Sequence, residues 1–398
     1  MNSHHSIELF SLLSFLDPVR EPLKDAWASV THNVTAHLPF SPKWLALPAV
    51  VTSYYTARYL WELVRVRDPA SKVVFVTGTD SGFGYLLAVK LARESGMTVF
   101  AGCLTERGRK AIAEEDRRLG GSGGRLVDVP LDVTDEDSCQ AAARFIEENL
   151  KPGECEYNFA ISIKSQPQAL CSDFWALVNN AGVLGLFGPD AWCSVEGEYY
   201  PTMNVNAFGM VRCVHAFLPL LKRSGRERGE GRIVSASSIV GRMAYAFGAP
   251  YSMTKYAVEA YMDTIRQELS PWGITCCILE PSGFKTPFLN IPDIHRRVDR
   301  VWDRLSDEVK EEYGEEYHQQ VTAYFLGAEK YASPKLHHVV DNYFHAVTAK
   351  WPRLRYRCGW ESLLIYVPAS YLPTVMGDWV LRRLTKHHLI VPAAIKNS

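Results

Sequence analysis

Short apolar runs rich in β-branched residues alternate with longer segments of helical periodicity through the middle of this chain. Strands that alternate with helices in this way build a mostly parallel sheet with helices on both faces. The chain is therefore predicted to be an α/β protein whose doubly wound sheet binds ligands at the carboxyl ends of its strands. The predicted strands are residues 73–76, 98–103, 126–131, 175–178, 233–236 and 275–279.

A glycine-rich turn, residues 77–84 (TGTDSGFG), joins the first predicted strand to the first predicted helix. Glycines let the backbone approach a phosphate because no Cβ stands in the way, and the N-terminus of the following helix attracts negative charge. Glycines alone can mark a tight turn without a ligand, but the flanking strand and helix favour the pyrophosphate site of a Rossmann-type domain. The residues predicted to line this site are Gly78, Asp80, Ser81, Gly82, Phe83 and Gly84.

Tyr251 and Lys255 are four residues apart in a segment whose apolar positions continue as a helical stripe. On one helix their side chains lie one turn apart on the same face. A phenol with a pKa of about 10 is a poor acid or base at neutral pH, but a nearby ammonium group favours the phenolate and lowers that pKa. The pair therefore predicts a proton-transfer site. Ser238, which follows the strand at 233–236, is placed to hydrogen-bond an oxygen held by Tyr251.

The same spacing occurs at Tyr331 and Lys335, so the spacing alone is a weak signal. Pro334 lies between these two residues, and proline breaks a helix because it lacks an N–H group and clashes with the preceding turn. We therefore expect no helix to join Tyr331 to Lys335. The preference for the pair at 251 and 255 depends on the motifs upstream of it.

Further polar residues follow the ends of predicted strands. Asp132 follows the third strand, Asn179 the fourth and Pro281 the sixth. Because the carboxyl ends of parallel strands lie at one edge of the sheet, these residues should face the crevice that holds the glycine-rich turn. Asp132 is placed to hydrogen-bond an adenine, and a role in a turn or helix cap is its alternative.

Taken together, these motifs resemble those of the short-chain dehydrogenase/reductase family over about residues 72–290. Chance does not assemble so many motifs in one order, so the resemblance is specific. The five motifs are TGTDSGFG at 77–84, Asp132, Asn-Asn-Ala-Gly at 179–182, the set Ser238, Tyr251 and Lys255, and Pro-Ser-Gly at 281–283 followed by Thr286.

The resemblance implies a role for each residue of the motifs. Tyr251 would be the general acid/base for the carbinol or carbonyl oxygen, and Lys255 would lower its pKa and hold the nicotinamide ribose. Ser238 would orient the substrate, and Asn206 would support a water that relays protons. Beyond the turn, the cofactor would contact Asp132, Asn179, Ala181, Gly182, Tyr251, Lys255, Pro281, Gly283 and Thr286.

A narrower resemblance, through residues 99–104 (VFAGCL), 217–221 (FLPLL) and 268–273 (ELSPWG), links the chain to one branch of the family. That branch contains retinol dehydrogenases, the 17β- and 11β-hydroxysteroid dehydrogenases of type 2 and 3-hydroxybutyrate dehydrogenase. The leading hypothesis is an NAD(P)-dependent oxidoreductase for a lipophilic alcohol or ketone of steroid or retinoid type. A short hydroxy acid is the alternative substrate, because residues 241–244 (GRMA) look closest to the hydroxybutyrate enzyme. A non-catalytic scaffold that binds NAD(H) is the third hypothesis.

The sequence marks the choice of cofactor weakly. A basic residue at position 81 or 104 would favour the 2′-phosphate of NADP, and an acidic residue at position 103 would favour the free 2′-hydroxyl of NAD. The chain has Ser81, Leu104 and Cys103. NAD is predicted through the branch resemblance, and NADP stays an alternative. Two departures from the family pattern are Ser282, where glycine is usual, and the long insertion at 151–173.

Residues 1–70 form an N-terminal extension before the catalytic region at 71–290. Residues 44–57 are uncharged and aromatic, but this stretch is too short to span a bilayer. With the apolar residues that continue to Val64, residues 44–64 are predicted to associate with a membrane as a tilted anchor or an interfacial helix. A helix packed on the domain is the alternative. The resemblance implies the endoplasmic reticulum membrane, with the mitochondrion as the alternative, and a homodimer.

Residues 291–398 are expected to build the substrate pocket and a cap over it. Residues 296–317 are highly charged and predict a helix with a solvated face. The apolar stretch at 363–375 is interrupted by prolines and is interpreted as a cap or a lipid-contacting surface. The chain has 43 basic and 44 acidic residues, so nucleic acid is not expected as a partner. Its scattered cysteines predict neither a disulfide framework nor a metal site.

Overall fold

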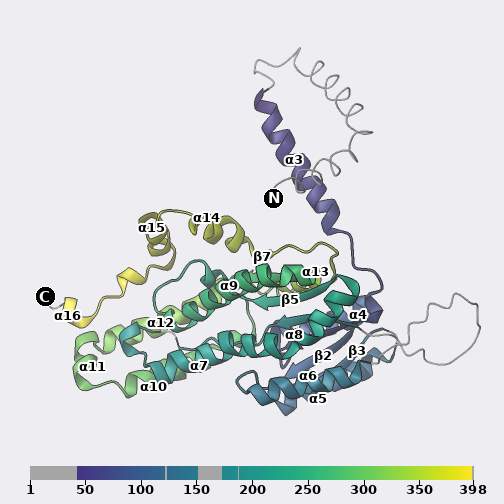
Figure 1. Ribbon diagram of the computed structural model, residues 1–398. Coiled ribbons are helices and arrows are strands. Elements are labelled where there is room, and N and C mark those ends of the chain that lie inside the picture. Colours follow the sequence, from purple (N-terminus) through teal and green to yellow (C-terminus); the bar gives the residue numbers. More distant parts are fainter. Residues whose placement is uncertain (1–42, 122, 151–172, 187, 397–398) are drawn as a thin grey trace, which may run out of the picture. The chain divides into compact units, whose positions relative to one another are not determined.

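Seven strands form a parallel sheet in the larger of two compact units (Figure 1). The computed structural model describes residues 43–121, 123–150, 173–186 and 188–396, and the two units divide between Val64 and Arg65. The smaller unit contributes one described helix, α3 (Lys43–Glu62). The predicted insertion at 151–173 lies outside the described residues except for Asp173, which begins a strand.

The strand order confirms the predicted doubly wound sheet. The order is β3-β2-β1-β4-β5-β6-β7 and every neighbouring pair is parallel. It reverses between β1 and β4, which is the switch point where such sheets bind ligands. The sequence analysis missed β7, because its sequence, RYRC, lacks the apolar run that marks the other strands. The strands are β1 (Lys72–Thr77), β2 (Thr98–Cys103), β3 (Arg125–Pro130), β4 (Asp173–Asn179), β5 (Gly231–Ala236), β6 (Ile274–Pro281) and β7 (Arg355–Cys358).

Helices cover both faces of the sheet (Figure 1). The helix predicted from Asn204 begins earlier, because α7, a π-helical turn and α8 follow one another without a gap. As predicted, no helix joins Tyr331 to Lys335, since α12 ends at Tyr331. The helices of the larger unit are α4 (Gly82–Ser95), α5 (Glu106–Leu119), α6 (Glu136–Asn149), α7 (Tyr200–Met203), α8 (Gly209–Arg228), α9 (Ala249–Leu269), α10 (Ile291–Asp303), α11 (Asp307–Tyr313), α12 (Glu315–Tyr331), α13 (His337–Thr348), α14 (Val367–Ala369), α15 (Thr374–Thr385) and α16 (Ala393–Lys396).

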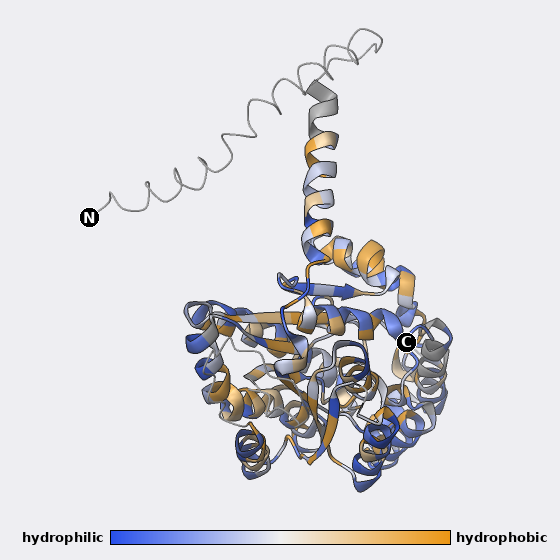
Figure 2. Ribbon diagram, turned by 90° about the vertical axis from the view of Figure 1, so that its right-hand side faces the viewer, coloured by the Kyte–Doolittle hydropathy of each residue, from blue (hydrophilic) through white to orange (hydrophobic). Residues whose placement is uncertain are grey.

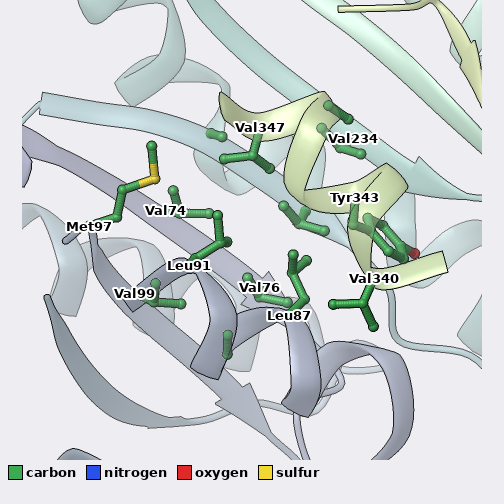
Figure 3. Packing of buried hydrophobic residues seen from close by; sticks show 14 of the residues in the cluster. Val74, Val76, Leu87, Leu91, Met97, Val99, Val234, Val340, Tyr343 and Val347 are labelled. Atoms are coloured by element: carbon green, nitrogen blue, oxygen red, sulfur yellow. The ribbon is translucent and has the colours of Figure 1, made fainter. Parts of the chain in front are cut away.

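Side chains of β1 alternate between two buried cores. Val74 and Val76 belong to the core that α4 and α13 cover, together with Tyr343 of α13 (Figure 3). Val73 and Phe75 belong to the opposite core, which α6, α8 and α9 cover. A strand buried on both faces is apolar at nearly every position, which is why β1 was recognisable from its sequence.

The helix α3 of the smaller unit carries apolar residues among polar ones along its length (Figure 2). It contains Pro48, and Arg58 pairs with Glu62 at 3.0 Å near its end. None of the helices that the structure describes combines the length and the apolar character needed to cross a bilayer.

We expect the substitution Phe217→Ala to destabilise the larger unit by about 3–5 kcal/mol, as is typical for a buried phenylalanine. Phe217 of α8 is fully buried, and its ring stacks on Phe75 at 4.5 Å and on Phe174 at 5.3 Å between centroids. Urea unfolding followed by circular dichroism measures the loss. Phe217→Leu keeps most of the volume and should cost about 1 kcal/mol; equal losses in the two variants would contradict a stabilising role for the buried volume of this side chain.

Candidate active site

The glycine-rich turn after β1 has a backbone shape that requires its glycines. Gly78 and Gly82 have φ angles of 67° and 62°, in a region that favours glycine. A Cβ added at Gly84 would lie 2.3 Å from the carbonyl oxygen of Gly78, so a larger residue does not fit. The turn leads into the N-terminus of α4, whose free N–H groups attract an anion. These features fit the pyrophosphate of a dinucleotide.

The segment after β4 holds this turn in place. Asn180 donates through Nδ2 to the carbonyl oxygens of Thr77 and Gly78, at 3.1 and 3.0 Å. The Thr77 hydroxyl oxygen accepts in return from the N–H groups of Asn180 and Ala181, both at 3.0 Å. Asn180 is a positioning residue that the sequence analysis missed, although the Asn-Asn-Ala-Gly motif contained the signal.

Asp80 ties the glycine-rich turn to the end of β2. Its carboxylate accepts hydrogen bonds from the N–H groups of Leu104 and Thr105, at 2.9 and 2.8 Å, and from the Thr105 hydroxyl at 2.6 Å. This contact was not predicted, because it joins residues that are 24 or more positions apart in the chain. It places a negative charge beside the loop that follows β2.

Three other predicted cofactor residues make contacts within the protein. Ser81 is the N-cap of α4, and Phe83 packs edge to face on Phe284 at 5.7 Å between ring centroids. Asp132 accepts from the N–H and hydroxyl groups of Thr134, at 2.8 and 2.7 Å. Asp132 therefore has the turn role that was its alternative. Contact of these three residues with a cofactor stays a prediction.

The helix α9 places Tyr251 and Lys255 on one face. Lys255 Nζ lies 5.5 Å from the centroid of the Tyr251 ring and donates a 3.0 Å hydrogen bond to the Ala236 carbonyl oxygen at the end of β5. Ser238 forms a hydrogen bond with Tyr251, and its hydroxyl also donates to the Pro281 carbonyl oxygen at 3.3 Å. The structure thus brings the tyrosine, lysine and serine together at the carboxyl ends of β5 and β6.

Burial governs the acid–base properties of this group. Tyr251 and Lys255 are 7% and 5% exposed, and burial disfavours the charged form of each. Burial raises the pKa of Tyr251, and the hydrogen bond with Ser238 opposes this rise. Burial lowers the pKa of Lys255 to about 8, and the charge of Glu259 opposes this fall. Desolvation of the phenolate therefore sets the direction of the Tyr251 pKa, and the lowering expected from Lys255 stays a prediction.

Asn206 links the helix α9 to the loop after β4. It lies in a π-helical turn, η4 (Asn204–Phe208). Its Oδ1 accepts from the Val183 N–H group at 2.7 Å, and its Nδ2 donates to the Val183 carbonyl oxygen at 2.8 Å and to Thr254 Oγ1 on α9 at 3.1 Å. A Cβ on Gly182 would come within 3.2 Å of Asn206 Oδ1. The water relay predicted for Asn206 stays a prediction.

Asn179 ends β4 at the centre of the sheet. Its Nδ2 donates to Ser235 Oγ on β5 at 3.2 Å, whereas its Oδ1 is buried and has no hydrogen-bond partner among the described residues. It lines a small cavity together with Thr77 and Asn206. Because an unpaired buried amide oxygen costs about 1–3 kcal/mol, this strand end would be stabilised by a polar group beside it.

The loop after β6 lies opposite the glycine-rich turn. The side chain of Thr286 lies 3.7 Å from the place that a Cβ on Gly82 would take. The carbonyl oxygen of Gly283 accepts from the Ser333 N–H group at 2.9 Å, which ties the loop to the segment after α12. The loops after β1, β5 and β6 therefore lie close together, and the crevice expected between them stays a prediction.

Tyr251 belongs to a buried cluster of apolar and aromatic side chains. The charged segment at 296–317 is divided among α10, α11 and α12, and the apolar residues of α10 and α12 face inward because they recur at helical spacing. The Phe288 ring lies 5.9 Å from that of Tyr251. The buried residues that cluster with Tyr251 are Leu184, Leu186, Trp192, Ile239, Val240, Ile294, Val298, Val301, Trp302, Tyr317, Val321 and Val367.

A doubly wound parallel sheet with a glycine-rich turn at its switch point, and a tyrosine, lysine and serine at neighbouring strand ends, defines a dinucleotide-dependent oxidoreductase. The family model for short chain dehydrogenases matches residues 72–155 and 161–292. The chain therefore belongs to the short-chain dehydrogenase family, as its motifs suggested. It is an NAD(P)-dependent alcohol dehydrogenase or reductase.

Relatives with hydroxysteroid and retinol dehydrogenase names are similar over most of the chain. A 3beta-hydroxysteroid dehydrogenase, dhs-16, of Caenorhabditis elegans is 42% identical over 320 residues, which cover 80% of this chain and 76% of that protein. The 17-beta-hydroxysteroid dehydrogenase type 6 of Rattus norvegicus is 36% identical, with 85% of this chain and 96% of that protein covered. Retinol dehydrogenase 7 of the same organism is 35% identical with the same coverage.

A solved structure supports the fold. A short chain dehydrogenase/reductase from Burkholderia phymatum, in complex with NAD, matches with a TM-score of 0.56 and 20% sequence identity. The match covers 81% of this chain and 96% of that chain. At this level of identity, the likeness concerns the arrangement of strands and helices.

We expect Gly84→Ala to weaken NADH binding by about tenfold or more, equivalent to at least about 1.4 kcal/mol. The added methyl group would displace the Gly78 carbonyl and so deform the turn. Quenching of NADH fluorescence by the full-length protein measures the change. Gly377→Ala is the matched control, because it also lies in a helix and its Cβ would meet only ordinary contacts of 3.7 Å or more. Equal affinities for NADH in both variants would contradict the assignment of the turn.

Proposed function

We propose that the protein transfers a hydride between a nicotinamide cofactor and a lipophilic alcohol or ketone of steroid or retinoid type. One observation carries the proposal: Tyr251 is hydrogen-bonded to Ser238, close to Lys255, in surroundings of apolar side chains. In oxidation, the carbinol C–H bond breaks and its electron pair leaves with the hydride, the hydroxyl proton passes to Tyr251 Oη, and the C=O bond forms. The nicotinamide, when bound, accepts or supplies the hydride.

The environment of the tyrosine suits a proton donor and acceptor. Because its pKa is raised, Tyr251 is protonated at neutral pH and ready to donate a proton in reduction. Oxidation requires the phenolate and is therefore favoured at higher pH. Lys255, with a pKa of about 8, is mostly charged at neutral pH and stabilises negative charge on the tyrosine oxygen as the proton moves. Ser238 orients the substrate oxygen toward Tyr251.

The side chains around Tyr251 favour a lipophilic substrate over a short hydroxy acid. A hydroxy acid would bring a carboxylate into this cluster of apolar and aromatic residues. Burying a carboxylate without a cationic partner is costly, by several kcal/mol or more. The names of the hydroxysteroid and retinol dehydrogenases that the chain resembles support the same substrate class.

The contact of Asp80 favours NAD as the cofactor. Its carboxylate lies against the backbone of Leu104 and Thr105, in the loop after β2. In doubly wound nucleotide-binding folds, an acidic group near this place binds the ribose 2′-hydroxyl and repels a 2′-phosphate. The negative charge that would favour NAD is thus carried by Asp80 in the glycine-rich turn and not by the residue at position 103.

We expect Tyr251→Phe to reduce turnover by about 10²–10⁴-fold, the range typical for loss of a positioned acid or base. Absorbance of NADH, measured with steroid and retinoid alcohols and with either NAD or NADP, follows the reaction. Tyr256→Phe is the matched control, because Tyr256 is on the same helix and its side chain is exposed. Binding of NADH should be unchanged in both variants.

Three results of this assay, run with 3-hydroxybutyrate as a further substrate, would contradict a part of the proposal. Full activity of Tyr251→Phe would show that another group transfers the proton. Faster turnover of 3-hydroxybutyrate than of any lipophilic alcohol would assign the alternative substrate class. Higher turnover with NADP than with NAD at equal concentration would contradict the inference from Asp80.

We also propose that the protein associates with a lipid surface through the C-terminal apolar face, defined as Leu364, Tyr371, Val375, Met376 and Trp379. These side chains are exposed, Val375 by 81% and Trp379 by 60%. The Arg383 guanidinium lies 5.5 Å from the Trp379 ring, and aromatic residues with flanking basic ones suit a lipid headgroup boundary. The endoplasmic reticulum, the mitochondrial alternative and a homodimer stay predictions from the resemblance.

We expect the double variant Val375→Glu, Trp379→Glu to bind vesicles of phosphatidylcholine and phosphatidylserine at least about tenfold more weakly than the wild type, since each buried apolar side chain contributes about 1.5–3 kcal/mol. Flotation of the full-length protein with vesicles measures binding. Val195→Glu is the control, because Val195 is similarly exposed, at 65%, on a different element. Equal flotation of the double variant and the wild type would contradict this surface.

A further inference from the structure

A group of charged side chains lies along α9, on the turns that follow Lys255. We call it the Arg355 cluster, and its members come from four parts of the fold: the residue just after the 3-10 turn η5 (Ile239–Gly241), the helix α9, the end of β6 and the strand β7. They meet only in the folded chain, since Arg355 is 75 to 96 residues from its partners. The members are Arg242, Glu259, Asp263, Glu280 and Arg355.

Arg355 is the centre of this cluster. Its Nη1 atom lies 2.9 Å from Glu280 Oε1 and also contacts Glu259 Oε2. Its Nη2 atom contacts Asp263 Oδ2, one turn further along α9. Hydrogen bonds between ionised groups are stronger than neutral ones, and a planar guanidinium holds two carboxylates in fixed directions. The strand β7 therefore fixes the orientation of the middle of α9.

Glu280 connects the cluster to the substrate and cofactor loops. It is fully buried, at 0% exposed, and immediately precedes Pro281, whose carbonyl oxygen accepts from Ser238. Arg242 Nε, in the segment after Ser238, lies 2.8 Å from Glu280 Oε1. A buried carboxylate persists only when it is paired. The two arginines therefore hold the ends of β5 and β6 together beside Ser238.

Glu259 connects the cluster to Lys255. It is four residues after Lys255 on α9, so the two side chains lie one turn apart on the same face. The preceding loop packs tightly on this turn, because a Cβ on Gly241 would lie 2.9 Å from the Lys255 carbonyl oxygen and 3.0 Å from Glu259 Cγ. Glu259 is also mostly buried, and its Oε1 has no hydrogen-bond partner among the described residues.

Lys255 lies beside the acidic side chains of this cluster. Asp263 also pairs with Arg266 at 3.1 Å, so three carboxylates face three guanidiniums. The buried Lys255 ammonium group is an additional cation, one helical turn from Glu259. Charges that are buried together stabilise one another because water does not screen them.

We propose that Glu259, held in place by Arg355, is a positioning residue that keeps the Lys255 amine protonated and directed toward Tyr251. This inference rests on the proposed function, because it assigns the support of the same catalytic group. Glu259 opposes the effect of burial on the Lys255 pKa. Burial raises the pKa of Glu259 itself, and a hydrogen bond with Ser237 and the charge of Arg355 oppose that rise. The C-terminal strand β7 thereby takes part in catalysis without contacting the substrate.

Other titratable groups lie on α9 and on the elements around it. They are Tyr251 and Arg266 on α9 itself, Arg242 just after the turn at Ile239–Gly241, Glu280 on β6, Arg232 on β5, Tyr200 on α7, and Glu196 and Glu198 on the π-helical turn η3 (Val195–Tyr199). Of these, Arg232 pairs with backbone carbonyl oxygens on the side of α13, and Glu198 pairs with Arg304.

The test compares Glu259→Gln with the wild type in the full-length protein. Competitive labelling with acetic anhydride between pH 6 and 11, followed by peptide mass spectrometry, gives the apparent pKa of Lys255 directly. We expect this pKa to fall by about one unit in the variant, because an opposite charge close by is removed. The kcat/KM of the variant should then be about one-fifth of the wild-type value at pH 8 and nearly equal to it at pH 6, as a one-unit shift from a pKa of about 8 requires.

Asp263→Asn is the matched control. Asp263 also pairs with Arg355 and lies on α9, but it is two turns from Lys255 and its side chain is 40% exposed. It should leave the pKa of Lys255 unchanged. Arg355→Met removes the cation that holds Glu259 in place, and thermal unfolding shows whether this variant folds. Glu259→Gln decides the matter in either case.

An unchanged Lys255 pKa in Glu259→Gln would overturn the proposal, and so would an equal shift in Asp263→Asn. The labelling needs no substrate and therefore separates this proposal from the proposed function. If the wild type oxidised no alcohol and the Lys255 pKa still fell in Glu259→Gln, the proposed function would fail while the electrostatic role of Glu259 would stand.

Discussion

The proposed catalytic group depends on one constraint: the Lys255 ammonium group is buried beside the phenol of Tyr251. Lys255 is almost fully buried, donates to the Ala236 carbonyl oxygen and lies 5.5 Å from the Tyr251 ring centroid. Placing a cation there is unfavourable unless anions and carbonyl oxygens replace the lost water. The surrounding polar groups follow from this need: the end of β5 supplies a carbonyl oxygen, and α9 supplies Glu259.

This constraint explains why the C-terminal part of the chain completes the catalytic unit. Glu259 and Glu280 are themselves buried, so they need the cations that Arg242 and Arg355 provide. Arg355 belongs to β7, the last strand of the sheet. The same region adds α10, α12 and α14 to the apolar cluster around Tyr251. The C-terminal region thus supplies both the arginine that pairs with Glu259 and part of the apolar cluster that contains Tyr251.

Much of the fold and part of the site could be predicted from local sequence. Strands buried on both faces, such as β1, are apolar at nearly every position, and Gly78 and Gly82 occupy backbone conformations that favour glycine. Tyr251 and Lys255 share a helix face because their spacing alone requires it. Contacts between distant segments were not predictable in this way. Asp80 meets Leu104 and Thr105 only because β1 and β2 are neighbours, and β7 lacks an apolar run in part because its Arg355 pairs with α9.

The sequence by itself determined the alternation of strands and helices, the glycine-rich turn and the helix face that carries the tyrosine and lysine, because short-range spacing and backbone sterics decide these features. The tertiary structure alone decided the electrostatics. Spacing placed Lys255 near Tyr251 and suggested a lowered tyrosine pKa, but burial raises it. Solvation and charge pairing depend on all the atoms around a group, and most of those atoms come from segments that are distant in the chain.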